Sequence, residues 1–479
     1  MKKVFSNFIY QAIFQVMKII IPIITIPIIS RALGPEGVGI YNYTYSITSY
    51  FILFAGLGIT LYGSREIALV QQDREKLSET FWEIFKLKAI LSLVNLFAFI
   101  ILSSQLDYSL YLYLQVLSVL SVFFDVTWFY IGVEDFKKTM LSNSLIQCIT
   151  FILIITLIKE PSDLWKYVLI QSLSFFLPQI FPWFFLRQYI DIKRVKLINS
   201  IKRIKDAVNF FIPQIAIIIY TTLNKTFLGI FVGAEAVGYY SSSLTMNLVF
   251  ITLITTFDTV MLPRMSNMYT KNKDNMLGTL KKTTDGQLFF SIAIMFGMLT
   301  IFNKFVPWFL GEKFLFVNNL IPLFSVLIVI VPLGMAISRQ YLIPTGNIKA
   351  YNVSVLIGAI ISVVINIILL PRIGIYGVVI ASISAELFVL ISRLIFLYKN
   401  TTFRFDYLKI SKYLSSALVM CLLTRKITEH LPETITTNIL QAIIGSIIYM
   451  IMTTLLGCNL FVNLYRLHKV KNKVLAQKS

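Results

Sequence analysis

The sequence predicts an all-α integral membrane protein with about fourteen transmembrane helices. Hydrophobic residues make up 57% of the chain and charged residues only 14%, whereas soluble domains carry about 25% charged residues. The apolar runs reach the length of about 20 residues that a helix needs to cross the hydrocarbon. The alternation typical of membrane β-strands is absent from these runs. Because lipid offers the backbone no hydrogen-bond partner, such runs are expected to form helices.

The predicted spans follow one another through short connections of charged and turn residues. In chain order they cover residues 8–32, 38–62, 80–103, 109–132, 140–158, 164–187, 207–232, 236–262, 284–310, 317–343, 350–370, 375–398, 408–427 and 436–457. The first run is longer than the apolar segment of a signal peptide and has no small-residue cleavage site. We therefore expect it to stay in the mature chain.

The distribution of Lys and Arg predicts the orientation. If both termini lie in the cytoplasm, most of the 43 basic residues fall in cytoplasmic connections, including the run 187–205 and the tail 466–478. Short loops rich in Lys and Arg stay on that side. We therefore expect a multi-pass protein of the cytoplasmic membrane with both termini inside. Its net charge of +20 then serves topology and contacts with anionic membrane lipids, not nucleic acid.

One phrase occurs twice, as LGPEGVGIYN at 33–42 and as VGAEAVGYYS at 232–241. At one constant offset it pairs identical residues: Gly34 with Gly233, Glu36 with Glu235, Val38 with Val237, Gly39 with Gly238, Tyr41 with Tyr240, and Arg65 with Arg264. The offset covers an even number of spans, so the two copies are expected to run in parallel through the membrane. Glycine allows the tight reversal that a helical hairpin needs.

The duplication predicts two parallel six-helix lobes around a central cleft, plus two extra C-terminal helices. We assign residues 1–190 to the first lobe, 191–206 to a basic cytoplasmic linker, 207–400 to the second lobe, and 401–479 to the extra helices and a basic tail. Each copy of the repeated phrase then forms the outer hairpin of one lobe.

Four segments resemble polysaccharide flippases of the Wzx type, in the multidrug, oligosaccharidyl-lipid and polysaccharide exporter superfamily. They are SRALGPEGVGIYNYTYS at 30–46, DVTWFYIGVEDFKK at 125–138, LNKTFLG at 223–229 and PRIGIYGVVIAS at 371–382. The resemblance implies two lobes and alternating access. It implies translocation of an undecaprenyl pyrophosphate-linked repeat unit of capsule or another envelope polysaccharide. It also implies that the last two spans form a groove for the polyprenyl tail. Asn224 departs from the pattern, because many relatives have an acid there.

Charged residues inside the spans are the candidate binding residues, because a charge at bilayer depth costs about 2.5 to 3.5 kcal/mol and usually faces a cavity or a partner. Arginine offers a bidentate fork and lysine a point charge for a pyrophosphate. The cationic cleft is predicted to contain Lys18, Arg31, Lys225 and Arg339. Arg65 and Arg264 are secondary candidates, since basic residues at helix ends also serve as topology anchors.

Three deep acids, Asp125, Asp258 and Glu386, are candidates for ion coupling. For Glu386 a structural ion pair is the alternative, because Arg393 lies two helical turns further along the same face.

Enzymatic chemistry is not expected. The two histidines, His430 and His468, lie outside the spans, so no histidine-based acid–base or metal constellation can form within the membrane. Cys148, Cys421 and Cys458 have unrelated spacings, which predicts neither a disulfide framework nor a metal site. No cofactor is implied.

The expected partners are the lipid-linked oligosaccharide, membrane lipids, and the polysaccharide polymerase and glycosyltransferases of the same pathway. Three transport alternatives stay open: a multidrug or cation antiporter of the same superfamily, a teichoic-acid precursor flippase, and a sugar transporter of the major facilitator type. A pocket for cationic drugs should be acidic, which disfavours the first. Fourteen spans disfavour the last.

Overall fold

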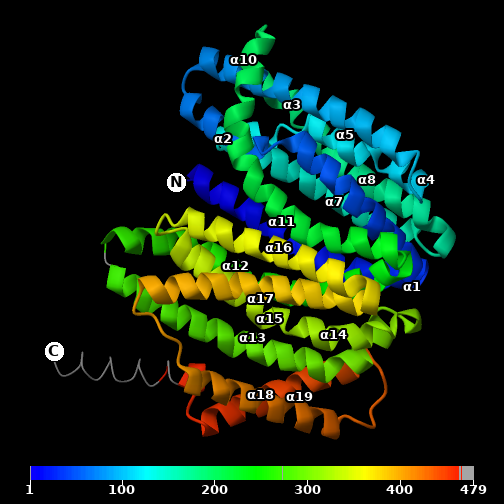
Figure 1. The fold of residues 1–479 in the computed structure, drawn as a ribbon, viewed down its shortest axis with the longest axis vertical. Coiled ribbons are helices and arrows are strands. Elements are labelled where there is room, and N and C mark those ends of the chain that lie inside the picture. Colours follow the sequence, from blue (N-terminus) through cyan, green and yellow to red (C-terminus); the bar gives the residue numbers. More distant parts are fainter. Residues whose placement is uncertain (1, 272, 463–464, 466–479) are drawn as a thin grey trace. The chain divides into compact units, whose positions relative to one another are not determined.

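The computed structural model describes residues 2–271, 273–462 and 465 (Figure 1). Side chains are described for all of these except residues 2–16, 18, 19, 136, 209, 210, 212–214, 216, 217, 219, 220, 273 and 274. Within the described ranges the regular elements are helices and no strand occurs. The all-α prediction is therefore confirmed.

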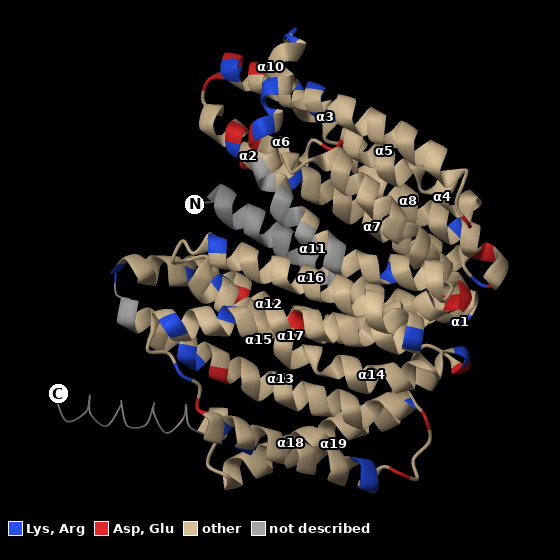
Figure 2. Cartoon of the chain, viewed as in Figure 1, with Lys and Arg blue, Asp and Glu red and all other residues tan. Residues whose placement is uncertain are grey.

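Eleven helical stretches of the described residues are long and apolar enough to cross a membrane. The first of them, Ile20–Val70, covers the second part of the predicted span 8–32 and all of the predicted span 38–62. Helices α11 and α18 occupy the predicted spans 207–232 and 408–427 and are not among the eleven. Figure 2 shows charged residues mainly near helix ends and in connections, with long uncharged stretches between them. The chain is thus a multi-pass integral membrane protein.

The helices form two compact units, residues 1–238 and 239–479. The first unit contains α1 (Lys2–Gly56), α2 (Ile59–Val70), α3 (Arg74–Ser103), α4 (Ser109–Leu114), α5 (Val116–Phe124), α6 (Thr127–Gly132), α7 (Phe136–Leu157), η1 (Pro161–Asp163), α8 (Leu164–Ile180), α9 (Trp183–Leu186), α10 (Leu197–Lys202), α11 (Ile204–Phe231) and the first turn of α12. Helix α11 thus belongs to this unit. The predicted boundaries at residues 190, 206 and 400 concern the duplication and stay predictions.

Both copies of the repeated phrase turn at their first glycine. Gly34 interrupts α1 with φ 68° and separates two helical segments across a kink. Gly233, with φ 119°, separates α11 from α12. Residues with a Cβ rarely adopt such positive φ values. The predicted tight turns are confirmed at both positions.

The last glycine of each phrase allows the two turns to contact each other reciprocally. A Cβ on Gly39 would lie 1.7 Å from the Ala234 carbonyl oxygen, and a Cβ on Gly238 would lie 1.9 Å from the Pro35 oxygen. Pro35 and Ala234 are themselves equivalent in the repeat. The two hairpin turns therefore pack backbone to backbone, which only glycine permits at this distance.

An aromatic cluster forms the core at one end of the first unit. Phe81 of α3 stacks on Trp128 of α6, with ring centroids 5.4 Å apart, and contacts Phe129 edge-on. All three side chains are fully buried. The aromatic residues of the motif DVTWFYIG therefore have a structural role in this fold, because their rings pack α6 against α3.

The basic segment that follows α9 is held against α3. Arg74 binds Asp191 through two hydrogen bonds of 2.9 Å, and this guanidinium holds the pKa of Asp191 below its ordinary value. The Trp82 indole donates to the Asp191 carbonyl at 2.9 Å, and Arg203 forms a salt bridge with Glu83 at 2.7 Å. The predicted linker is thus anchored along the same helix.

The second unit contains most of α12 (Ala234–Lys271), then α13 (Lys273–Phe309), η2 (Glu312–Phe314), α14 (Val317–Ser325), α15 (Leu327–Ile337), the π-helical segment η3 (Ser338–Leu342), α16 (Ile348–Ile373), α17 (Ile375–Asn400), α18 (Tyr407–Ile427) and α19 (Ile435–Leu455). At 1.5 Å per residue, α12 and α13 are longer than the hydrocarbon of about 30 Å. Their ends therefore extend beyond it.

The two C-terminal helices pack on α13. Tyr413 of α18 and Tyr449 of α19 both contact the Phe289 ring, with centroids 5.4 and 5.1 Å away. The Tyr449 hydroxyl also donates to the Phe289 carbonyl at 2.9 Å. Both rings belong to the apolar core of this unit, and the Tyr413 hydroxyl donates to Asp285 Oδ1 at 3.2 Å. Helices α18 and α19 are therefore built into the second unit.

Candidate functional site

Lys225 lies on α11 and contacts the part of α1 that follows the interruption at Gly34. Its Nζ donates to Asn42 Oδ1 at 3.0 Å, and the Asn42 amide donates to the Val38 carbonyl at 2.9 Å. The neighbouring Thr226 hydroxyl contacts Ser46 Oγ at 2.8 Å. Asn42 is a neutral partner, and no carboxylate forms a salt bridge with Lys225 among the described side chains. Its positive charge is therefore not neutralised within the described part of the unit.

Arg339 lies in the π-helical segment η3, which interrupts the regular helix after α15. Its Nη1 donates to Thr259 Oγ1 at 2.6 Å and to the Thr255 carbonyl at 3.4 Å, both on α12. These partners are also neutral. A π-helical turn within a helix often marks a functional position, because it displaces side chains from the regular pattern.

Asp258, between those two threonines on α12, is fully buried. Its Oδ1 accepts hydrogen bonds of 2.7 Å from the side-chain amides of Gln287 and Gln340. The Gln340 carbonyl accepts from the Thr283 hydroxyl at 2.6 Å. Arg339 and Gln340 are consecutive in η3. The structure thus brings a predicted cargo residue and a predicted coupling acid together on α12, α13 and η3.

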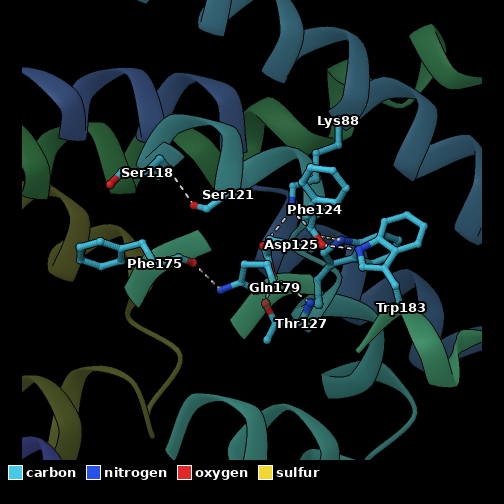
Figure 3. Close-up of polar contacts among 10 residues, drawn as sticks. Lys88, Ser118, Ser121, Phe124, Asp125, Thr127, Phe175, Gln179 and Trp183 are labelled. Carbon is cyan, nitrogen blue, oxygen red and sulfur yellow. Dashed lines mark hydrogen bonds and ion pairs between the residues drawn. The ribbon is translucent and has the colours of Figure 1, made fainter. Parts of the chain in front are cut away.

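Asp125 lies at a break between α5 and α6 and is bound by a lysine (Figure 3). Lys88 Nζ contacts Asp125 Oδ2 at 2.7 Å and the Asp125 carbonyl at 2.5 Å. Asp125 Oδ1 accepts from the Thr127 amide, the first amide of α6, at 2.9 Å. The Trp183 indole donates to the Phe124 carbonyl at 2.6 Å. The Lys88–Asp125 pair therefore stabilises the break between α5 and α6. Ion coupling at Asp125 stays a prediction.

Breaking the Lys88–Asp125 pair is expected to destabilise the first unit strongly. The Lys88 side chain is 1% exposed and that of Asp125 is 20% exposed, so Lys88→Met leaves a largely buried carboxylate without its cation. This should cost about 3 to 5 kcal/mol. The double variant Lys88→Met/Asp125→Asn removes both charges and should regain part of that loss. Unfolding of the purified protein in detergent measures both effects. A double variant no more stable than Lys88→Met would contradict the role of the Lys88–Asp125 ion pair in stability.

The other predicted residues occupy varied positions. The Lys18 side chain lies outside the described residues. Arg31, three residues before the Gly34 turn, is exposed. Arg65 on α2 and Arg264 on α12 are exposed too. Glu386 is half-buried on α17. The exposure of Arg65 and Arg264 is consistent with a role as topology anchors. Their role as secondary binding residues stays a prediction.

Sequence reasoning missed the side chains that contact the predicted residues. Lys88 could have been found, because it lies inside the predicted span 80–103 just as Lys225 lies inside its own. Asn42, Gln287 and Gln340 carry no such signal, since neutral amides are common in any chain. Among the described residues, no group of three or more His, Cys, Asp or Glu could hold a metal ion.

A groove of about 320 Å³ lies between α13 and α19 in the second unit. Its lining is almost entirely apolar and includes Phe290, Gly297, Met420, Gly445 and Tyr449. The two glycines keep it open: a Cβ on Gly297 would meet nothing within 4 Å, and one on Gly445 would make only ordinary contacts with Met420 and Thr424. Such a groove can accept a hydrocarbon chain.

A family model described as "Polysaccharide biosynthesis protein" matches residues 4–269, more than half of the chain. The chain belongs to this family. Three of the four segments that carried the resemblance, 30–46, 125–138 and 223–229, lie within the matched range. The predicted family is therefore confirmed.

Curated relatives match a large part of the chain. It is 24% identical over 283 residues to a candidate O-antigen transporter of Escherichia coli (strain K12), covering 58% of this chain and 68% of that protein. It is 21% identical over 379 residues to a candidate O-antigen transporter of Shigella dysenteriae, covering 78% and 94% of the two chains. Both relatives are described as transporters, which agrees with the expectation that this family member is not an enzyme.

Two solved structures share the fold. The lipid II flippase MurJ in an inward closed conformation matches with a TM-score of 0.76 at 15% identity, covering 94% of this chain and 100% of that one. An inward-facing multidrug resistance MATE family transporter of the MOP superfamily matches with a TM-score of 0.61 at 15% identity, covering 86% and 99%. At such identities the likeness concerns the fold alone. It confirms the predicted fold class.

Proposed function

We propose that this protein translocates an undecaprenyl pyrophosphate-linked oligosaccharide from the cytoplasmic to the outer leaflet of the cytoplasmic membrane, with both termini in the cytoplasm. Family membership and the two O-antigen transporter relatives support a polysaccharide cargo. The fold shared with a lipid II flippase supports a lipid-linked one. The product is capsule or another envelope polysaccharide, and the pathway's glycosyltransferases and polymerase supply and consume the cargo.

The observation that carries this proposal is a contrast between two kinds of cation, of which Lys88 is buried and Arg203, Lys225 and Arg339 are half-buried. Lys88 and Arg203 form salt bridges with Asp125 and Glu83, so their charges are neutralised inside the protein. Among the side chains that the structure describes, Lys225 and Arg339 donate only to neutral oxygens, those of Asn42, Thr255 and Thr259. A cation at membrane depth that lacks a carboxylate suits an anionic ligand.

The chemistry of the cargo suits these cations. A pyrophosphate that crosses about 30 Å of hydrocarbon unaided loses its hydration at a prohibitive cost. Arg339 offers a fork for bidentate contacts, and Lys225 offers a point charge. We propose that each of them serves the anionic head group from its own unit, that Lys18 and Arg31 add to the positive charge of the first unit, and that alternating access moves the cargo without covalent chemistry.

The groove between α13 and α19 suits the remaining part of the cargo. A polyprenyl tail is too apolar for a site that binds pyrophosphate, and its hydrocarbon needs an apolar surface. The aromatic and methionine lining of the groove offers one within the second unit. We propose that the tail lies in this groove while the charged head group moves.

A transport assay with purified protein in liposomes tests the proposed function. The liposomes contain a fluorescent undecaprenyl pyrophosphate-linked oligosaccharide, and a membrane-impermeant glycosidase outside reports the fraction that reaches the outer leaflet. We expect protein-dependent exposure of the glycan and no accumulation of a cationic dye. Dye transport without glycan exposure would overturn the proposal in favour of the cation-antiporter alternative.

A further inference from the structure

Several buried oxygen atoms of the second unit lack a hydrogen-bond partner among the described residues, and two of them belong to side chains that are already joined. Asp258 Oδ2 and Gln287 Oε1 are both buried without a donor. The same two side chains are linked by the 2.7 Å hydrogen bond from Gln287 Nε2 to Asp258 Oδ1. A polar atom that leaves water without gaining a partner is rare in folded proteins. Two in one bonded pair therefore need an explanation.

The hydrogen bonds around Asp258 are one-sided. Oδ1 accepts from two amides, those of Gln287 and Gln340, whereas Oδ2 accepts from none. The Thr283 hydroxyl donates to the Gln340 carbonyl, which orients the Gln340 amide toward Asp258. An ionised carboxylate would use both oxygens as acceptors. A neutral carboxylic acid has one accepting oxygen and one O–H that donates, and this is the pattern that the site offers.

We propose that Asp258 carries a proton on Oδ2 and donates it to Gln287 Oε1. One proton from the adjoining solution forms the O–H bond, and the acid and the amide then exchange two hydrogen bonds. The proton satisfies both orphan oxygens at once, and no other bond breaks. A metal cation held by oxygen takes about six ligands, whereas the described residues offer two orphan oxygens here.

Arg339 is a charged neighbour of this acid, because its guanidinium contacts the same turn of α12. On α12, Thr255 and Thr259 flank Asp258 and accept from Arg339. The α13 side chains that join the network, Thr283 and Gln287, are neutral, as is Gln340 of η3. With the proton present, Asp258 is neutral and the Arg339 charge stays available. When the proton leaves, the carboxylate attracts Arg339 and competes with an anionic ligand.

The proton therefore controls how strongly Arg339 holds a pyrophosphate. Cargo binding favours protonated Asp258, so affinity falls as pH rises through the range where this proton is lost. This step rests on the proposed function, because it assigns the pyrophosphate to Arg339. The protonation of Asp258 does not rest on it, since the argument uses only the two orphan oxygens.

Infrared spectroscopy of the purified full-length protein tests the protonation directly. We expect a protonated-carboxyl C=O band at neutral pH that shifts in ²H₂O and is lost in Asp258→Asn. Asp285→Asn is the matched control, since Asp285 forms a salt bridge with Lys409 at 2.5 Å and Asp285→Asn should leave the band unchanged. Gln287→Leu should keep the band but shift it, because the O–H loses its acceptor. This variant also serves if Asp258→Asn does not fold.

A binding experiment tests the coupling. Undecaprenyl pyrophosphate should bind wild-type protein more weakly at alkaline pH, whereas Asp258→Asn, which mimics the neutral acid, should bind it equally well at every pH. The absence of the Asp258 band at neutral pH would overturn the proposed protonation. An ionised Asp258 in a protein that needs sodium for its stability would overturn it as well. A band without pH-dependent binding would overturn the coupling alone. Failure of the liposome assay with the band present would overturn the proposed function and leave the protonated acid intact.

Discussion

Lys225→Ala and Arg339→Ala are each expected to reduce export of the lipid-linked repeat unit by about tenfold to a hundredfold. Each variant removes a charged hydrogen-bond donor that the pyrophosphate uses, and such an interaction contributes about 1.5 to 3 kcal/mol. Little stability should be lost, because their partners Asn42 and Thr259 are neutral and no carboxylate is left without its cation. The amount of protein in the membrane should therefore stay unchanged. The liposome assay and an immunoblot of membranes measure the two quantities.

The charge itself, and not the shape of the side chain, should decide these effects. Lys225→Arg is expected to keep more export than Lys225→Ala, because the cargo needs a cation at that position. Lys76→Ala is the control for a lost positive charge, since Lys76 is 71% exposed and pairs with Asp73 at a helix start. Full export by both alanine variants would remove Lys225 and Arg339 from the proposed site.

Filling the groove between α13 and α19 should abolish translocation without unfolding the protein. Gly297→Phe places an aromatic ring in the groove of about 320 Å³, where it excludes the polyprenyl tail. The expected result is loss of export with normal membrane insertion. Deleting residues 406–479, which removes α18 and α19, should abolish export as well. Export measured with the labelled lipid-linked oligosaccharide tests both variants.

The chain offers two matched controls for the groove. Gly297→Ala adds a Cβ that meets nothing within 4 Å and should leave export intact. Gly278→Phe adds the same ring to the same helix, at a glycine that also has open space around it and does not line the groove. It should export normally. Undiminished export by Gly297→Phe would exclude the groove as the site of the tail.

Sequence reasoning placed the spans and the turns well because both have local causes. A membrane helix satisfies its backbone hydrogen bonds within its own segment, so an apolar run of the right length is sufficient to predict it. The turns at Gly34 and Gly233 need positive φ at one residue, and glycine supplies it. The reciprocal contact of Gly39 and Gly238 was not predictable, since it depends on which turns pack together.

The rule that charges at membrane depth are functional selected candidate residues but could not rank them. It selected Lys225, Asp125 and Asp258 alike. In the structure Lys88 neutralises Asp125, Asn42 leaves the charge of Lys225 in place, and two glutamines hold only one oxygen of Asp258. Depth along a span is a property of the sequence, whereas the partner of a charge depends on which helix lies next to it.

The sequence by itself therefore determined the membrane helices, the duplication and the family, because length, hydropathy and a few motifs act within one segment at a time. Only the tertiary structure decided which buried charges are neutralised. That distinction depends on contacts such as Lys88 with Asp125, which join residues far apart in the chain. The energy of a buried charge is set by the few atoms within hydrogen-bonding distance, and packing alone selects those atoms.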